Sequence, residues 1–223
     1  DFWQTDLVRP RRPTVLEEVE VGLYFAATLW KVMPHLYRDL RGALARSYPE
    51  TDFPLQSFLR LGSWIGGDQD GNPNVTTEVT ARTLTRMRRA AAEAHLRQCR
   101  LLLDILSSSQ KQVGVDPELE RRVAGTAALY PEAAGRLEAE SSAEIYRRFL
   151  RLVEWRLEQT AAVRIPGEVP AGAYRHKAEL SGDLATIRLS LEHNKGGRIV
   201  DGELADWMCR AEVFGLHYAA LDI

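Results

Sequence analysis

Apolar residues recur at steps of three and four through most of this chain, the spacing that places them on one face of an α-helix. The longest such stretch runs from Thr14 to about Ser47. Thr14, with Glu17 three residues later, predicts a capping box at its start. Pro34 lies inside the stretch and predicts a kink, because proline has no N–H for the helix hydrogen bond. A long, kinked amphipathic helix is therefore expected first.

Further helix starts are marked by residues whose side chains accept hydrogen bonds from the first free backbone N–H groups. These predicted caps are Thr76 before a second long helix that ends near Ser107, Asp116 before Pro117, Ser141 with Glu144 as another capping box, and Asp201 before a short helix through Val213. The segment from about Lys177 to Glu192 has the same apolar periodicity. The sequence thus predicts a mainly α fold.

Two short segments depart from the helical spacing and predict strands. Residues 58–65 are mostly apolar and end at a pair of glycines, and residues 216–223 are aliphatic and aromatic. We expect one mostly helical domain over residues 1–223, with a strand and glycine-rich loop over 57–75, a helical region over 76–215 and a terminal strand over 216–223. Because a terminal strand needs partners, this domain is expected to be an internal piece of a longer polypeptide.

Composition excludes several classes of function. The 29 basic and 31 acidic residues nearly cancel, so no overall field favours nucleic acid or an anionic membrane. The two cysteines, Cys99 and Cys209, lie far apart in helical stretches, unlike a disulfide framework or a zinc cluster. No apolar run is long enough to span a membrane, and the N-terminus lacks a signal-peptide pattern. We expect a cytoplasmic protein that binds neither nucleic acid nor membrane.

The glycine-rich segment 66–74 concentrates the residues that suit ligand chemistry. Its glycines, Gly66, Gly67 and Gly71, let the backbone approach a ligand closely and present amide N–H groups to phosphate or carboxylate oxygens. Asp68 and Asp70 would instead hold a cation, or would cap the loop's own amides as in an ordinary tight turn. The residues themselves leave these alternatives open.

Spacing excludes three familiar loops. A Walker sequence needs lysine after glycine, and no lysine occurs between Lys31 and Lys111. A calcium loop of the EF-hand type starting at Asp68 would need glycine at the position of Pro73 and glutamate at that of Val79. The glycines also lack the spacing of a dinucleotide-binding fingerprint.

Other candidates stand out by position. Trp64 ends the first predicted strand, where an indole would form an apolar wall or donate one hydrogen bond. His217 is the one histidine considered for a site role, since no two of the five have helical metal-ligand spacing. A helical face rich in arginine predicts a solvated or interface surface, or a site for an anionic effector. Its members are Arg82, Arg86, Arg89, Arg97 and Arg100.

The stretch GSWIGGDQDGNPNVT over residues 62–76 resembles a signature segment of phosphoenolpyruvate carboxylases. Residues 2–6, 146–160 and 213–223 resemble the same family in the same order. One departure lies inside the signature, because Gln69 stands where the family usually has arginine. A neutral amide cannot replace a fixed charge, so an ion pair normally made there is lost or rerouted.

The resemblance implies a large, mostly helical enzyme around a parallel (β/α)₈ barrel to which the two short strands contribute. It also implies a lyase reaction that needs Mg²⁺ or Mn²⁺ in the full-length enzyme. Bicarbonate attacks the phosphate of phosphoenolpyruvate, giving carboxyphosphate and an enolate, and the enolate captures CO₂ to form oxaloacetate.

Site residues follow from the resemblance too, since it places Trp64 and the loop after it in a pocket for bicarbonate or CO₂. The expected catalytic residues are Trp64, Asp68 and Asp70, and the expected substrate-binding residues are Trp64, Gly66, Gly67, Gly71 and Asn72. The family's catalytic histidine, phosphate-binding arginines and metal ligands are expected outside this piece. We therefore expect it to bind no metal or other cofactor alone and to be inactive alone.

The implied partners are phosphoenolpyruvate, bicarbonate and the remainder of the same polypeptide, within a homo-oligomer that is a tetramer when full length. A non-enzymatic alternative remains. In that alternative the chain is a helical binding or scaffold domain that holds a cation with Asp68, Asp70 and Asn72.

Overall fold

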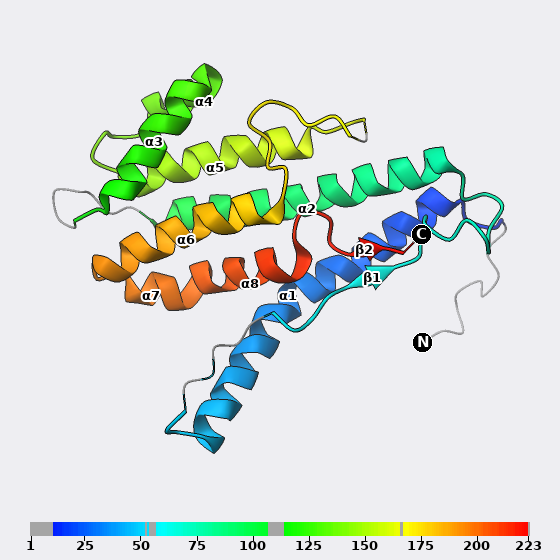
Figure 1. Ribbon diagram of the computed structural model, residues 1–223, viewed down its shortest axis with the longest axis horizontal. Helices are drawn as coiled ribbons and strands as arrows, with labels where there is room; N and C mark the ends of the chain where they lie inside the picture. Colours follow the sequence, from blue (N-terminus) through cyan, green and yellow to red (C-terminus); the bar gives the residue numbers. More distant parts are fainter. Residues whose placement is uncertain (1–10, 52, 54–56, 107–113, 166, 223) are drawn as a thin grey trace, which may run out of the picture.

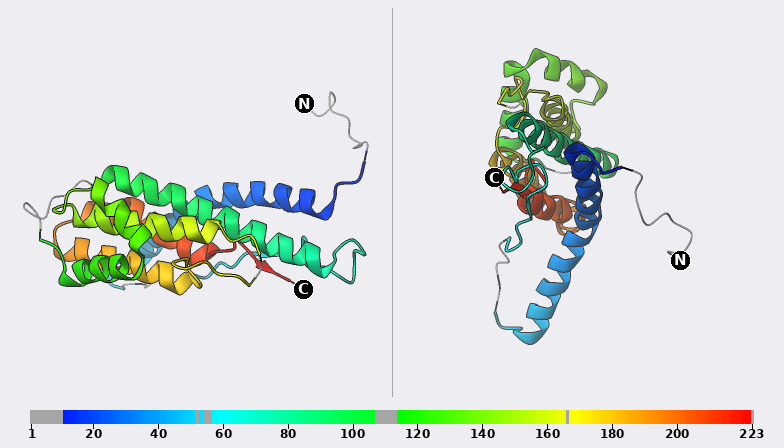
Figure 2. Two further views of the ribbon diagram at one scale, coloured as in Figure 1. Left: turned by 90° about the horizontal axis from the view of Figure 1, so that it is seen from above. Right: turned by 90° about the vertical axis from the view of Figure 1, so that its right-hand side faces the viewer.

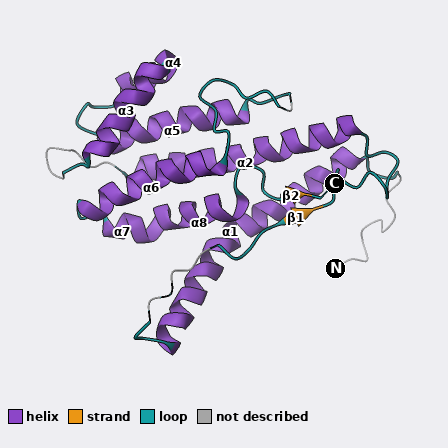
Figure 3. Ribbon diagram, in the orientation of Figure 1, coloured by secondary structure: helices purple, strands orange, loops and turns teal. Residues whose placement is uncertain are grey.

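The computed structural model describes residues 11–51, 53, 57–106, 114–165 and 167–222. They form an elongated bundle of helices with two short strands along one side (Figures 1 and 3). The mainly α fold with two short strands is therefore confirmed, whereas the family resemblance at residues 2–6 lies outside the described residues. No helix in these ranges is both long and apolar enough to cross a membrane.

The described residues form twelve elements along the chain. They are α1 (Val15–Ser47), β1 (Gly62–Ser63), α2 (Thr77–Ile105), α3 (Pro117–Leu129), α4 (Pro131–Gly135), the 3₁₀ turn η1 (Arg136–Ala139), α5 (Ile145–Ala161), α6 (Lys177–His193), α7 (Gly197–Ile199), the π-helical segment η2 (Val200–Leu204), α8 (Ala205–Phe214) and β2 (Ala220–Leu221).

The first helix begins as predicted. The backbone N–H of Glu17 donates to the Thr14 hydroxyl at 3.3 Å, and the N–H of Thr14 donates to the Glu17 carboxylate at 2.8 Å, completing the capping box. Pro34 is buried inside α1, which continues through it, and the second half of the helix extends away from the bundle (Figures 1 and 2).

Pro34 has no N–H to offer the carbonyl of Trp30 four residues earlier. Arg210 of α8 supplies the missing donor, because its Nε donates to the Trp30 carbonyl oxygen at 3.0 Å. Its Nη1 donates to Oε1 of Gln98 on α2 at 2.7 Å. One arginine thus ties α1, at its proline, to the two helices that pack beside it.

The main core lies between α2, α3, α5, α6 and α8. Burying each large apolar side chain there contributes roughly 1.5–3 kcal/mol. Its largest fully buried members are Trp207, Tyr146, Tyr174, Leu102, Leu106, Leu119, Leu150, Leu152, Leu157, Leu180, Leu184 and Ile187. A second cluster packs α1 against the bundle and reaches the turn before β2. It comprises Met33, Tyr37, Ala91, Ala94, Val213, Phe214 and Tyr218.

Two of the predicted caps are confirmed. The Thr76 hydroxyl accepts from the N–H of Val79 at 3.3 Å at the start of α2, and the Asp116 carboxylate accepts from that of Glu118 at 2.9 Å at the start of α3. Both side chains therefore satisfy helix donors that would otherwise lack a partner.

The other two predicted caps are wrong. The Ser141 hydroxyl accepts from Ala143 at 3.3 Å within a separate turn, so α5 starts only at Ile145. Asp201 lies inside η2, and α8 starts at Ala205 because Gly202 has non-helical angles of φ −100° and ψ −117°. Glycine adopts such angles without a steric penalty.

The two strands pair in parallel, with Gly62 opposite Ala220 and Ser63 opposite Leu221. The N–H of Ala220 donates to the Leu61 carbonyl at 2.8 Å, and that of Asp222 donates to the Ser63 carbonyl at 2.9 Å. Two-residue strands are much shorter than the predicted ones over 58–65 and 216–223.

The second strand starts late because a turn occupies the residues before it. Gly215 and Tyr218 have positive φ angles of 52° and 66°, which no strand residue adopts. The N–H of Tyr218 donates to the Phe214 carbonyl at 3.0 Å, closing the turn. Within the described residues the sheet has two strands, and the complete barrel remains a proposal.

Candidate active site

The glycine-rich loop begins where β1 ends and finishes at Thr76, the cap of α2. The N–H groups of Gly67 and Asp68 both donate to the carbonyl of Trp64, at 2.9 and 3.2 Å, which turns the chain sharply after the strand. Gly66 within this turn has φ of +85°, a value that favours glycine. The turn therefore presents Trp64 at the carboxyl end of β1.

Two of the glycines are wedged between elements that are far apart in sequence. A Cβ on Gly66 would overlap the side chain of Thr83 on α2, and a Cβ on Gly67 would overlap the carbonyl oxygen of Asp222, just after β2. Both positions are buried. The absence of a side chain at Gly66 and Gly67 thus lets the loop pack between α2 and the end of β2.

The polar side chains of the loop hold its own backbone. The Asp68 carboxylate accepts from the N–H of Gly71 at 2.8 Å, and a Cβ on Gly71 would overlap that carboxylate. The Asn72 side-chain oxygen accepts from the N–H of Asn74 at 3.0 Å. These contacts match the tight-turn alternative for Asp68 and Asn72, and they occupy the amides of Gly67 and Gly71 within the loop.

The remaining loop residues face solvent. The side chains of Gln69 and Asp70 are exposed, and Trp64 is 74% exposed. Within the described residues, no three His, Cys, Asp or Glu side chains come together as a possible metal site. At the carboxyl end of β1 the loop therefore exposes one indole, that of Trp64, and one carboxylate, that of Asp70.

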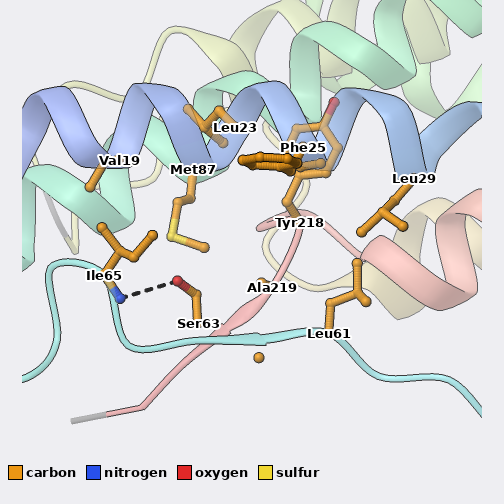
Figure 4. Close-up of a pocket in the computed structure, with 13 residues that line it drawn as sticks. Val19, Leu23, Phe25, Leu29, Leu61, Ser63, Ile65, Met87, Tyr218 and Ala219 are labelled. Atoms are coloured by element: carbon orange, nitrogen blue, oxygen red, sulfur yellow. Dashed lines mark hydrogen bonds between the residues drawn. The ribbon is translucent and has the colours of Figure 1, made fainter. Parts of the chain in front are cut away.

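An apolar cavity of about 260 Å³ lies behind the loop, between α1, β1 and the turn before β2 (Figure 4). Ile65, Leu23, Met87 and Tyr218 are among its lining residues. The N–H of Ile65 donates to the Ser63 hydroxyl at 3.2 Å, as the dashed line in Figure 4 shows. Such a lining offers few partners for an anion, so this cavity does not suit bicarbonate or a phosphate.

A more polar groove of about 870 Å³ borders the same two strands. Arg60, Lys177, Glu212 and His217 line it, and Lys177 donates to the Glu212 carboxylate at 2.9 Å. His217, the histidine considered from sequence, has an exposed side chain here. The structure thus places it beside β2 rather than in the glycine-rich loop.

The arginine-rich face of α2 makes ion pairs with neighbouring helices. Arg86 donates to Glu20 of α1 at 2.9 Å, and Arg100 donates to Glu154 and Glu158 of α5 at 2.8 and 3.2 Å. At these two positions the arginines join helices, as the interface interpretation expects. Arg100 in particular pairs with a carboxylate that is itself buried.

His95 is a residue whose importance the sequence reasoning missed. Its fully buried ring lies in α2, with Nε2 2.8 Å from the Gly215 carbonyl oxygen and Nδ1 accepting from the Trp207 indole N–H at 3.0 Å. Burial, together with the charge of Arg210, lowers the pKa of His95 to about 4, although its bond to Gly215 opposes this shift. The ring is therefore neutral at pH 7.

A signal for His95 was present in the sequence. It lies at helical steps from Ala91, Gln98 and Leu102, all on the buried face of α2. A histidine on such a face needs partners for both ring nitrogens. That requirement, rather than any metal-ligand spacing, would have singled it out.

Comparison with known proteins supplies the context for this loop. The family model described as phosphoenolpyruvate carboxylase matches residues 1–223. Proteins named phosphoenolpyruvate carboxylase from Roseiflexus castenholzii, Xanthomonas campestris and Mycobacterium avium are 39%, 38% and 38% identical over 231, 222 and 229 residues.

These matches cover 100%, 99% and 100% of this chain but only 25%, 24% and 23% of the three relatives, so the chain spans about a quarter of their length. The match runs through the glycine-rich loop, both strands and every described helix. The chain belongs to the phosphoenolpyruvate carboxylase family.

Proposed function

We propose that this chain is part of a lyase that carboxylates phosphoenolpyruvate with bicarbonate, giving oxaloacetate and phosphate in anaplerotic carbon fixation. The observation that carries the proposal is the loop wedged at the carboxyl end of β1, within a chain that matches the family throughout. Ligands of parallel α/β folds bind at that end of the strands. The chain alone is proposed to be inactive.

Trp64 is proposed to form one wall of the bicarbonate pocket. Its side chain is 74% exposed at the end of a strand, so it is free to contact a ligand or another part of the polypeptide. The enolate formed when bicarbonate takes the phosphoryl group must meet CO₂ before it meets a proton from water. An indole wall helps to exclude that water.

The loop residues would then have distinct roles. Asp68, whose carboxylate holds the N–H of Gly71, would maintain the shape of the loop, while the exposed Asp70 would accept the hydroxyl hydrogen of bicarbonate. Gly66 and Gly67 would set the depth of the pocket, because their packing fixes where the backbone turns. Gly71 and Asn72 would also contact the substrate in this proposal.

The family implies a divalent cation, Mg²⁺ or Mn²⁺, but the described residues do not fit one, since they assemble no group of three suitable ligands. We therefore place metal binding in the remainder of the full-length polypeptide. The same remainder would supply the other strands of the (β/α)₈ barrel, because a sheet of two two-residue strands is marginal by itself.

The cation-binding scaffold gains no support as a second function. Asp68 Oδ1 and Asn72 Oδ1 already accept N–H groups of the loop, and the described residues bring no three His, Cys, Asp or Glu side chains together around a cation.

The test is made on the full-length protein that contains this chain. Oxaloacetate formation from phosphoenolpyruvate and bicarbonate is followed with Mg²⁺ or Mn²⁺ present, using a malate dehydrogenase coupled assay. Omission of bicarbonate is the control, and phosphate release is measured in parallel. Product that depends on both substrates supports the proposal, and a folded full-length protein that yields none refutes it.

A further inference from the structure

The buried ring of His95 is linked to the glycine-rich loop through a short, continuous segment of chain. The indole N–H of Trp207 can only donate and the Gly215 carbonyl can only accept, so the ring must accept at Nδ1 and donate at Nε2. The Gly215 carbonyl by itself requires the N–H on Nε2, and the indole of Trp207 supplies a partner for the other ring nitrogen. The edge-on ring of Trp30, with its centroid 4.8 Å away, packs against the same imidazole.

Gly215 is the point where the chain leaves α8. Its φ of +52° starts the turn, and Tyr218 in that turn packs against Trp30 and Phe214 at centroid distances of 5.7 and 5.6 Å. The direction of the carbonyl at Gly215 therefore sets the path of the residues that follow. The His95 bond at 2.8 Å holds that carbonyl from the opposite helix.

The segment that begins at Gly215 ends against the loop. Beyond the turn, β2 pairs with β1, and the Asp222 carbonyl occupies the space that a Cβ on Gly67 would need. A shift of the chain at Gly215 would thus move the surface on which the loop rests. Thr83 of α2, which packs against Gly66, lies on the same helix as His95.

We propose that His95 is a positioning residue for the bicarbonate side of the active site, acting through its hydrogen bond to Gly215 to place β2 against the Trp64–Asn72 loop. This inference rests on the proposed function for its kinetic consequence. The structural link itself, from α2 to the loop, holds whatever the reaction.

The test compares two substitutions in the full-length enzyme. In His95→Gln the longer side chain carries an N–H close to the place of Nε2, so the bond to Gly215 is kept and that from Trp207 is lost. In His95→Asn the shorter side chain carries an acceptor close to the place of Nδ1. The bond from Trp207 is therefore kept, and the bond to Gly215 is lost. Each variant loses one buried hydrogen bond, and similar losses of thermal stability are expected.

The expected result separates positioning from stability. His95→Asn should raise KM for bicarbonate roughly tenfold, because small displacements of a binding wall have large effects, with little change in KM for phosphoenolpyruvate. His95→Gln should stay close to the wild type in both constants. Trp207→Phe is the matched control, since it removes a hydrogen bond of the same network but leaves the bond to Gly215.

Amide hydrogen exchange supplies a readout that does not depend on activity. The N–H groups of Ala220 and Asp222, which bond to β1, should exchange faster in His95→Asn than in the other two variants. Equal behaviour of His95→Asn and His95→Gln in kinetics and exchange would overturn the inference. So would a rise in bicarbonate KM in Trp207→Phe.

Failure of the proposed function is distinguishable from failure of this inference. If the wild-type protein forms no oxaloacetate, the function fails and exchange alone decides the role of His95. If His95→Asn does not fold, His95→Leu, which removes both ring hydrogen bonds, takes its place. A raised bicarbonate KM in His95→Leu beside a wild-type value in His95→Gln supports the role, and wild-type values in both contradict it.

Discussion

The Nε of Arg210 donates to the carbonyl of Trp30 at 3.0 Å, the carbonyl that loses its helix partner because the residue four positions later is Pro34. The hydrogen bond from the Arg210 side chain of α8 thus replaces the backbone hydrogen bond that α1 lacks at its proline. The proline is tolerated in the middle of a long helix because a neighbouring helix supplies the donor that it lacks.

This relationship predicts a coupling between Arg210 and Pro34. Arg210→Ala should destabilise the chain by about 1–3 kcal/mol, since it leaves the part-buried carbonyl of Trp30 unpaired. In a Pro34→Ala background the alanine N–H can reach that carbonyl, so the same substitution should cost clearly less. Urea unfolding of the wild type, both single variants and the double variant measures the difference, and strictly additive effects would contradict it.

The buried His95 predicts a pH dependence of stability. Its pKa is about 4 in the folded chain and 6.5 as the ordinary value, so the unfolded chain binds the proton first as pH falls. Stability is therefore lost as pH falls from about 6.5 towards 4, by about 2 kcal/mol at pH 5. Urea unfolding at pH 7 and pH 5 measures the loss. The His95→Gln variant lacks this titrating group and should lose about 2 kcal/mol less over the same interval.

The close packing of Gly67 predicts that two Gly→Ala substitutions change the stability of the chain in opposite directions. Gly67→Ala should destabilise by about 1–3 kcal/mol, because its methyl group overlaps the Asp222 carbonyl. Gly182→Ala in α6 meets nothing within 4 Å and should stabilise by about 0.5–1 kcal/mol, since alanine restricts the unfolded chain and favours helix. Thermal unfolding of both variants gives the comparison. Equal effects would show that Gly67 is not held by packing.

The exposed indole predicts a loss of activity with little loss of stability. In the full-length enzyme Trp64→Ala should lower kcat/KM for bicarbonate by roughly tenfold or more while KM for phosphoenolpyruvate changes little. Leu129→Ala is a suitable control, because Leu129 is 73% exposed and lies on α3, away from the loop. Steady-state kinetics with each substrate varied measures both constants. Unchanged carboxylation in Trp64→Ala would show that Trp64 does not form part of the bicarbonate pocket.

Much of the helical fold could be predicted because its signals are local. Thr14, Thr76 and Asp116 each lie within a few residues of the N–H groups that they accept from, so the sequence carries the whole interaction. Ser141 shows the limit of such signals. Its hydroxyl bonds to Ala143 in a turn that precedes α5, and the spacing to Glu144 is the same in either arrangement.

The strands and the site depended on contacts that no local pattern contains. Apolar composition predicted a strand at residues 216–223, but Tyr218 there has a positive φ and packs on Trp30 of α1, a contact between residues far apart in the sequence. The density of glycine in residues 66–74 is a local signal, and it led to the prediction of a ligand site there. The particular need for Gly67, however, comes from Asp222 at the other end of the chain.

β1 and β2 lie at the two ends of the helical region 76–215, and their pairing involves only Gly62 and Ser63 on one side and Ala220 and Leu221 on the other. Closing so long a loop is entropically unfavourable, and so few ladder bonds cannot offset it, so the helices must first bring Gly62 and Ala220 together. The glycine-rich loop should therefore be among the last parts of the chain to become ordered during folding. It should also be among the first to open in the native state, which makes this sheet the point where loss of helix packing would first disturb the loop.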